Sequence, residues 1–359
     1  MDTSKKRILF LCREHYLYGE HLHENKCSGL FHSATFVANS LRQQGHDARV
    51  LNVQDGNSID RVVTEFDPQV VVLEALWVTP AKLDELLSLP RHRRRRWIVR
   101  IHSKLTFLAM EGIAFQWLTG YRELQQHNRN FIIAPNNQEL AQDLETTWGL
   151  STCWLPNIYE PIQPVRGLDD PLPPPSTAPK QLGEHINIGC FGAIRPMKNP
   201  LAQAMAAVKF ANKLGVSAQF VVNAGRGEQS GEHVLRNLRD FFAGLPRHRL
   251  IELPWLHYGD FVRVVRTMDI GLQVSCCETF NNVSADFVSN DIPLVGSSEI
   301  DWLPSIFNAD PTSSDSITDA LLYAWKLPGY TLRYLSKHSL ARYNKMAKRE
   351  WDKFLDGGK

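Results

Sequence analysis

The sequence has no long apolar run, no C-x-x-C pair and almost no net charge. No stretch is long enough to span a bilayer and the apolar run in MDTSKKRILFLC is too short for a secretory signal, so we expect a cytoplasmic protein without a transmembrane segment. A formal net charge of +2 implies no global attraction to nucleic acid or membranes. Four of the six cysteines lie in or beside apolar runs, which predicts reduced, buried thiols.

A standard zinc motif such as H-E-x-x-H is also missing. The segment after the first expected strand is nevertheless rich in potential ligands, namely His15, His21, His23, His32, Glu20 and Glu24. Polar loops are common at such positions without any metal, so we expect an acceptor-facing or lid-like loop and no metal cofactor.

Short β-rich runs alternate with longer segments of helical periodicity, which predicts an α/β protein with parallel sheets. The expected strands of the first half are Arg7–Cys12, Ala48–Val53, Gln69–Leu73, Trp97–His102, Asn130–Ala134 and Thr152–Leu155. Those of the second half are Ile186–Phe191, Ala218–Asn223, Leu250–Leu253, Ile270–Val274 and Ile292–Gly296, with helices expected at Pro200–Leu214, Val234–Ala243 and Tyr258–Thr267.

The segment Pro161–Lys180 separates the two halves and contains seven prolines, so it predicts a linker rather than a regular element. We expect Rossmann-like domains at 1–158 and 185–330, a linker at 159–184, and a C-terminal helix at 331–359 that packs on the N-terminal domain. Ligands of such sheets bind beyond the carboxyl ends of the strands, so the two domains are expected to face a cleft.

The segment Asp269–Ser298 carries the strongest functional signal. Asn281 and Asn282 stand where a helix is expected to begin, which is preferred N-cap chemistry. A helix that begins just after a strand directs backbone N–H groups and the positive end of its dipole at one point, which favours phosphate. Glu278 in the preceding loop and Asp286 in the helix add carboxylates for sugar hydroxyls. Together they predict a nucleotide-sugar site.

The loop CFGAIRPMKNP follows the first strand of the second half. Gly192 permits a close backbone approach, and Arg195 and Lys198 place two cations just before a helix. Such a pair would neutralise a diphosphate. The alternative is a basic turn that solvates the end of the strand.

In this order and at this separation, the two segments resemble the retaining glycosyltransferases of the GT-B fold, which include bacterial glycogen synthase. That family has a Gly-Arg-x-x-x-x-Lys-Gly/Asn loop, then a Glu, seven residues and a second Glu around a Phe-Gly pair, followed by a Gly-x-Pro strand. The matching positions are Gly192, Lys198, Asn199, Glu278, Phe280, Asp286 and the run 290–295. The chain departs from the pattern at Ala193, Asn281 and Asp286, where the family has Arg, Gly and Glu.

The resemblance implies that Arg195 and Lys198, beside Gly192, bind the donor diphosphate and that Glu278 contacts the transferred sugar. It also implies transfer with retention, no covalent enzyme nucleophile and no metal.

By the same resemblance, the backbone amides of Asn281, Asn282 and Val283 hold phosphate and Asp286 holds the ribose. For Asp286 the alternative is a carboxylate that stabilises a helix N-terminus.

In the first half, His102 stands at the carboxyl end of an expected strand. The family often has a histidine there, close to the donor sugar; the alternative is a hydrogen-bonded core histidine. Ser28 and Gly29 resemble the family's small-residue loop after the first strand, and they are equally consistent with a helix cap.

The run RHRRRR supplies five arginines, namely Arg91, Arg93, Arg94, Arg95 and Arg96. It is either a solvated loop or a patch for a polyanionic acceptor such as DNA or an acidic glycan. Two functions therefore stay open beside a glycosyltransferase: a nucleotide-sugar epimerase or hydrolase of the same fold, and a nucleic-acid-binding protein. A glycosyltransferase that modifies DNA bases would combine the donor site with the basic patch.

Overall fold

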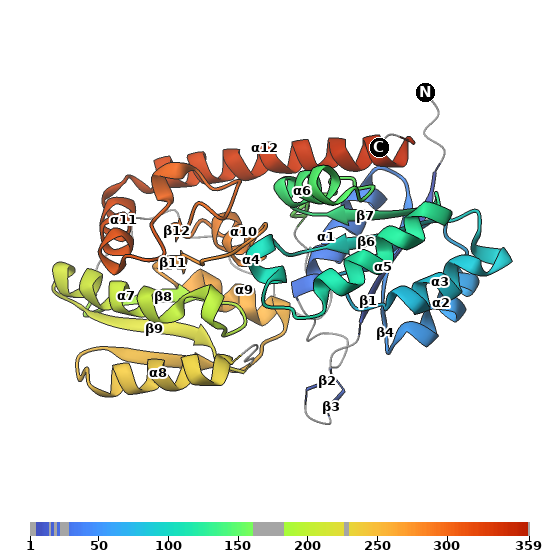
Figure 1. Ribbon diagram of the computed structural model, residues 1–359. Coiled ribbons are helices and arrows are strands. Elements are labelled where there is room, and N and C mark those ends of the chain that lie inside the picture. The colour runs from blue at the N-terminus through green and yellow to red at the C-terminus, as the bar shows by residue number, and fades with distance from the viewer. Residues whose placement is uncertain are drawn as a thin grey trace. The chain divides into compact units, whose positions relative to one another are not determined.

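A computed structural model describes residues 5–13, 16–17, 20–21, 29–160, 183–225 and 230–357 (Figure 1). The chain divides into two compact units: Met1–Gln163 with Tyr343–Lys359, and Pro164–Arg342. Each unit holds a parallel five-stranded sheet with helices around it, which confirms the expected α/β class. Residues 161–182, the core of the expected linker, lie outside the described residues.

The sheet of the first unit has the order β4-β1-β5-β6-β7. Its strands are β1 (Arg7–Arg13), β4 (Asp47–Val53), β5 (Val70–Glu74), β6 (Arg96–Ile101) and β7 (Phe131–Pro135). A short antiparallel pair, β2 (Tyr16–Leu17) and β3 (Glu20–His21), follows β1. The helices are α1 (Gly29–Gln43), α2 (Ile59–Phe66), α3 (Pro80–Ser88), α4 (Leu105–Leu108), α5 (Ala114–His127) and α6 (Gln138–Trp148), with 3-10 turns η1 (Gly56–Ser58) and η2 (Pro90–His92).

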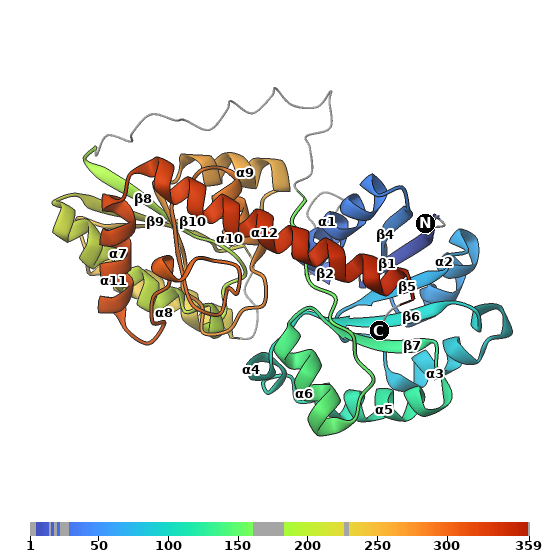
Figure 2. The same cartoon turned by 90° about the horizontal axis from the view of Figure 1, so that it is seen from above.

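Both faces of this sheet are buried, which explains why its strands are continuous apolar runs. Alternate residues of β1 enter different cores: Leu9 and Leu11 pack with α2, α3, α5 and α6, whereas Ile8 and Phe10 pack with α1 and the end of the last helix (Figure 2).

The expected strand Thr152–Leu155 is present only in part: Thr152 forms a single bridge, to Ile133 of β7. The N–H groups of Cys153 and Leu155 donate to the carbonyls of Ile133 and Pro135, both at 3.1 Å, as in a parallel ladder. Pro135 has no N–H to donate in return, so the ladder is incomplete.

The sheet of the second unit has the order β10-β9-β8-β11-β12. Its strands are β8 (His185–Cys190), β9 (Ser217–Asn223), β10 (Arg249–Leu253), β11 (Ile270–Gln273) and β12 (Leu294–Gly296). Its helices are α7 (Pro200–Leu214), α8 (Gly231–Ala243), α9 (Tyr258–Thr267), α10 (Asn282–Ser289) and α11 (Ser314–Lys326), with 3-10 turns η3 (Pro196–Lys198) and η4 (Ser305–Phe307). All five expected strands are present to within two residues.

Two glycines let α10 approach the sheet closely. A Cβ on Gly271 of β11 would lie 2.7 Å from the ring of Phe287, and one on Gly189 of β8 would lie 2.9 Å from the same ring. Phe287 is fully buried, so helix and strands leave no room for a larger residue at either position. This packing fixes the start of α10 beside the end of β11.

The last helix, α12 (Gly329–Leu355), has 27 residues. Its residues up to Arg342 belong to the second unit, and its later part belongs to the first. There Ala347, Trp351 and Phe354 are buried in the first unit's core, and the Trp351 indole donates to the Pro156 carbonyl at 2.9 Å. The expected packing of this helix on the N-terminal domain is confirmed. None of the helices in the described ranges is both long and apolar enough to cross a bilayer.

Candidate functional site

The strand order of the second unit points to one edge of its sheet. Connections leave β8 and β11 in opposite directions, and ligands of open α/β sheets bind beyond the carboxyl ends of strands at such a switch point. The segment Gly192–Lys198 follows β8, and the segment Ser275–Asn281 follows β11. The two segments singled out in the sequence therefore flank the position where this sheet is expected to bind a ligand.

Four hydrogen bonds hold these segments together. The side chain of Gln203 accepts from the Val274 N–H at 2.8 Å and donates to the Lys198 carbonyl at 2.7 Å. The Cys276 N–H donates to the carbonyl of Met197 at 2.9 Å. The Asn199 amide donates to the carbonyl of Val274 at 3.2 Å. Two loops far apart in the sequence thus form one preorganised surface.

Lys198 and Glu278 form an ion pair between Nζ and Oε1 on this surface. The Lys198 side chain is 20% exposed and that of Glu278 is 9% exposed, so solvent screens the pair weakly. The cation expected to bind a diphosphate and the carboxylate expected to contact a sugar are therefore in direct contact.

Gly192 has a φ of +116°, in the left-handed region that glycine tolerates best. Its N–H donates to Oδ1 of Asn223 at 3.1 Å, and a Cβ at this position would lie 4.0 Å from Cε of Lys198. The turn therefore brings backbone beside the Lys198 side chain. Arg195 is half-buried and immediately precedes η3.

Asn281 is the N-cap of α10, as expected. Its Oδ1 accepts from the Ser284 N–H at 2.9 Å, and its Nδ2 donates to Oε1 of Gln273 at 2.9 Å. Its φ of +60° explains why asparagine stands where the resembling family has glycine, because asparagine is the non-glycine residue that best tolerates this region. Asn282 and Val283 occupy the first helical turn, where backbone N–H groups have no intrahelical acceptor.

Asp286 is buried, with 3% of its surface exposed. It lies beyond the first turn of α10, where the effect of the helix dipole has largely decayed, so a helix-stabilising role is disfavoured. Its Oδ1 accepts from the hydroxyl of Tyr258 at 2.7 Å. Tyr258 begins α9, so a second helix fixes this carboxylate.

The first unit places His102 directly after β6, at the carboxyl edge of its sheet. Its Nε2 contacts the carboxylate of Glu74, the last residue of β5. Arg100 Nη1 lies 3.2 Å from Oε1 of the same carboxylate, and both Arg100 and Glu74 have fully buried side chains. Burial raises the pKa of Glu74, but Arg100 and His102 outweigh burial and lower it below its ordinary value. Burial lowers the pKa of His102.

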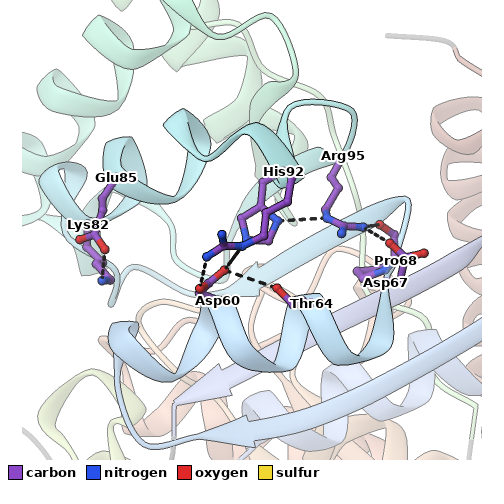
Figure 3. A network of polar contacts seen from close by, with 9 residues as sticks. Asp60, Thr64, Asp67, Pro68, Lys82, Glu85, His92 and Arg95 are labelled. Carbon is purple, nitrogen blue, oxygen red and sulfur yellow. Dashed lines mark hydrogen bonds and ion pairs between the residues drawn. The ribbon is translucent and has the colours of Figure 1, made fainter.

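Three of the five arginines of the run are engaged within the first unit; Figure 3 shows one of them, Arg95, beside Asp67. Arg91 forms a two-point contact with Asp60 at 2.9 and 2.5 Å, and Arg95 donates to Asp67 at 2.8 Å. Arg96 donates to the Phe354 carbonyl at 2.7 Å, and its guanidinium lies over the Phe354 ring. The remaining two, Arg93 and Arg94, are exposed.

Three potential ligands of the histidine-rich segment, His15, His23 and Glu24, lie outside the described residues. Glu20 and His21 form β3, and His32 lies on α1, where burial lowers its pKa to about 4. Gly29 is the exposed first residue of α1. Among the described residues, no group of three His, Cys, Asp or Glu side chains has the arrangement of a metal site.

Several polar residues that build these sites were not predicted from the sequence. They are Glu74, Asn136, Asn157, Gln203, Asn223 and Tyr258. A usable signal was present for Glu74 and Asn223, because each is the polar last residue of a strand and follows three apolar residues, at the strand end where α/β sites gather. Gln203 and Tyr258 lie on helices and gave no such signal.

No protein-family model and no curated protein matches the chain. Solved structures do, over nearly the whole length of both chains. A trehalose-6-phosphate synthase, OtsA, has a TM-score of 0.68 at 13% identity and covers 98% of this chain and 99% of its own. Anabaena HepE, solved with UDP and glucose, has a TM-score of 0.61 at 13% identity, covering 98% of this chain and 100% of its own.

A glycosyltransferase from Rickettsia africae has a TM-score of 0.57 at 11% identity, covering 97% of this chain and 99% of its own. At these identities the likeness concerns the fold. The chain has the two-sheet α/β fold of the GT-B glycosyltransferases.

Proposed function

We propose that the protein is a glycosyltransferase that moves a sugar from a nucleotide-diphosphate sugar to an acceptor hydroxyl. The observation that carries the proposal is the Lys198–Glu278 pair at the switch point between β8 and β11. In a sugar nucleotide, a single oxygen joins the sugar to the diphosphate. A site for both therefore needs a cation and a sugar-binding carboxylate within a few ångströms of each other, as these two residues are.

The proposed donor lies with its diphosphate on Lys198, Arg195 and the first turn of α10. When the sugar is transferred, negative charge develops on the departing diphosphate. Fixed cations and helix N-terminal amides stabilise such charge most effectively when they are already in place. Gln203 serves this purpose, because its hydrogen bonds fix the segment that carries Lys198.

Glu278 contacts the transferred sugar in this proposal, and Asp286 holds the ribose. His102 contributes from the first unit. Transfer with retention and without a metal is part of the proposal, on the strength of the motif resemblance. A cytoplasmic location is also part of it, since the described cysteines are free thiols and the cytoplasm keeps thiols reduced.

A donor screen tests the proposal. UDP-, GDP-, ADP- and TDP-sugars are added to the wild type, to Lys198→Ala and to Lys209→Ala, and the melting temperature is recorded with and without EDTA. Lys209 is a matched control, because it forms a lysine–carboxylate pair with Asp315 at 2.7 Å in the same unit, on the exposed surface.

The proposal predicts that one nucleotide class stabilises the wild type and Lys209→Ala but not Lys198→Ala, and that EDTA changes nothing. Retention is then tested by NMR of the anomeric proton of the product. If no nucleotide stabilises the wild type, or if Lys198→Ala responds like the control, the assignment of the site is wrong.

The acceptor class can be tested separately. Arg93 and Arg94 are exposed, whereas the exposed Arg91 is bound to Asp60, so a polyanionic acceptor such as DNA or an acidic glycan would meet Arg93 and Arg94 first. Replacing both with alanine should weaken salt-dependent binding of DNA or an acidic glycan without affecting the donor. Polyanion binding that is absent, or unchanged in the double variant, would remove this part of the proposal.

A further inference from the structure

The first unit contains a hydrogen-bond chain that fixes the position of a single proton. It runs from Arg100 through Asn157 and Asn136 to His102 and returns to Arg100 through Glu74. Glu74, Arg100, His102 and Asn136 lie on or directly after β5, β6 and β7 at the carboxyl edge of the sheet, and Asn157 follows the segment that pairs with β7. Four of them are buried, and the side chain of His102 is 9% exposed.

The direction of the chain follows from Arg100, which can only donate hydrogen bonds. Its Nη2 lies 2.6 Å from Oδ1 of Asn157, so that atom must be the amide oxygen and not the nitrogen. The Asn136 amide lies 3.3 Å from the same oxygen and must present its NH2 group there. The orientation of both amides is therefore set by one guanidinium.

The Asn136 NH2 group also faces Nδ1 of His102, at 3.4 Å. An amide NH2 can only donate, so Nδ1 must accept and carries no proton. On the other side of the ring, Nε2 contacts Glu74, whose ionised carboxylate can only accept. Both neighbours thus require the same state of the imidazole.

We propose that Glu74, held by Arg100, is a positioning residue that keeps His102 neutral with its proton on Nε2, so that Nδ1 is an acceptor at the edge of the sheet. The charges agree with this state. Arg100 and Glu74 already neutralise each other inside the protein, and a charged imidazole would leave one buried positive charge uncompensated.

The role that we assign to the unprotonated Nδ1 of His102 rests on the proposed function. The bond from Asn136 to Nδ1 is long for a hydrogen bond, and a sugar hydroxyl is a stronger donor that can replace it. His102 then accepts from the sugar with its ring orientation fixed by Glu74, as carboxylates orient histidines in many sites.

The test is the nitrogen NMR spectrum of the histidine rings in the full-length protein at pH 7.5. The His102 signals are identified by their absence in His102→Gln. We expect the pattern of a neutral ring protonated at Nε2. A ring protonated at Nδ1, or a charged ring, overturns the inference.

Two substitutions of the same shape sharpen the test. In Glu74→Gln, the amide oxygen stays with Arg100 and the NH2 group faces Nε2, so donors face both ring nitrogens. The proton should then move to Nδ1, because the 3.4 Å bond from Asn136 is the weaker one and is given up. In Asn136→Asp, acceptors face both ring nitrogens, so the ring should become charged. If neither variant changes the His102 spectrum, Glu74 and Asn136 do not set its state; if Glu74→Gln fails to fold, the wild type and Asn136→Asp decide.

His92 provides a matched control within the same unit (Figure 3). Its Nε2 contacts Asp60 at 2.8 Å and its Nδ1 accepts from Arg95 at 3.1 Å, so its ring should also carry the proton on Nε2. Asp60→Asn should change the His92 signals and leave those of His102 unchanged.

These spectra need no substrate. If His102 has the stated proton and no sugar nucleotide ever binds, the proposed function fails and the inference stands. If the donor is turned over and the ring is protonated elsewhere, the inference alone fails.

Discussion

The substitution Arg100→Met tests whether the buried ion pair of the first unit is as costly to break as its geometry implies. Arg100 and Glu74 both have fully buried side chains. Removing the guanidinium leaves the carboxylate in the core beside His102, and it also removes the donors to Leu155 and Asn157. Removing one partner of a buried ion pair costs about 3–5 kcal/mol, and we expect the free energy of unfolding of Arg100→Met to fall by that amount.

The double variant Arg100→Met with Glu74→Leu should be more stable than Arg100→Met alone, because it removes the stranded charge. Full recovery is not expected, since the N–H of His102 then lacks its acceptor, at a cost of about 1–3 kcal/mol. Lys209→Met is the control: its pair with Asp315 is exposed, and its loss should cost less than about 1 kcal/mol.

These changes in the free energy of unfolding can be measured by hydrogen exchange with mass spectrometry, because peptides covering β5 and β6 report the opening of the first unit by itself. A decrease of less than about 1 kcal/mol in the free energy of unfolding of Arg100→Met would refute the account. A double variant as unstable as the sum of the two single variants would also refute it, since the two charges would then not be coupled.

Three further predictions concern individual side chains. The hydrogen bond from Arg91 and the contact with His92 lower the pKa of Asp60 from 3.8 to about 2, so Asp60 stabilises the fold above pH 3.8 and this contribution is lost as the pH falls toward 2. Asp60→Asn should therefore reduce stability at neutral pH by about 1 kcal/mol, after discounting for the exposed part of the side chain, and flatten the acid limb of urea denaturation curves; an unchanged limb contradicts this. Tyr258→Phe should weaken nucleotide affinity roughly tenfold in calorimetric titration, because Asp286 loses a hydrogen bond to its charged group; unaltered affinity would separate this pair from the donor site. Cys276 is exposed and lies two residues from Glu278 of the Lys198–Glu278 pair, so the bound donor should slow its alkylation at alkaline pH, followed on the Cys276 peptide by mass spectrometry; equal rates with and without donor would contradict its placement.

The sequence predicted the strands well because parallel strands buried on both faces are short apolar runs that resemble little else. The boundaries of α7 and α9 matched the expected ones as well, since both helices carry clear end signals, such as proline at the start of α7 and glycine after its end. The segment Thr152–Leu155 was only partly predicted, although it donates two backbone hydrogen bonds to β7. What leaves its ladder incomplete is Pro135, a residue of the neighbouring strand that has no N–H to donate.

The site was predictable where one short segment carries its own signal. Asn281 is followed by helical residues and preceded by a strand, so its capping role could be inferred locally. The contact between Lys198 and Glu278 spans 80 positions and depends on β8 and β11 being neighbours, which composition does not determine. The resemblance between motifs assigned both residues to the donor site, but it did not predict that they contact each other.

The network around His102 could not be predicted for the same reason. In the sequence, Glu74, Arg100 and Asn157 are polar residues in or near separate apolar segments, and nothing local links them. They become a network when the sheet adopts the order that places β5 beside β6 and β6 beside β7. A charged residue inside an apolar strand, as Arg100 is in β6, is the one local hint that a buried partner exists.

The central claim is that Lys198 stabilises the departing diphosphate of a sugar nucleotide. The most direct measurement is the rate of nucleoside diphosphate release from the donor found in the screen, for the wild type, Lys198→Ala and Lys209→Ala. The account predicts that Lys198→Ala loses about 10²-fold or more in turnover while it remains folded at the assay temperature, and that Lys209→Ala retains full activity. Full activity in Lys198→Ala would contradict it.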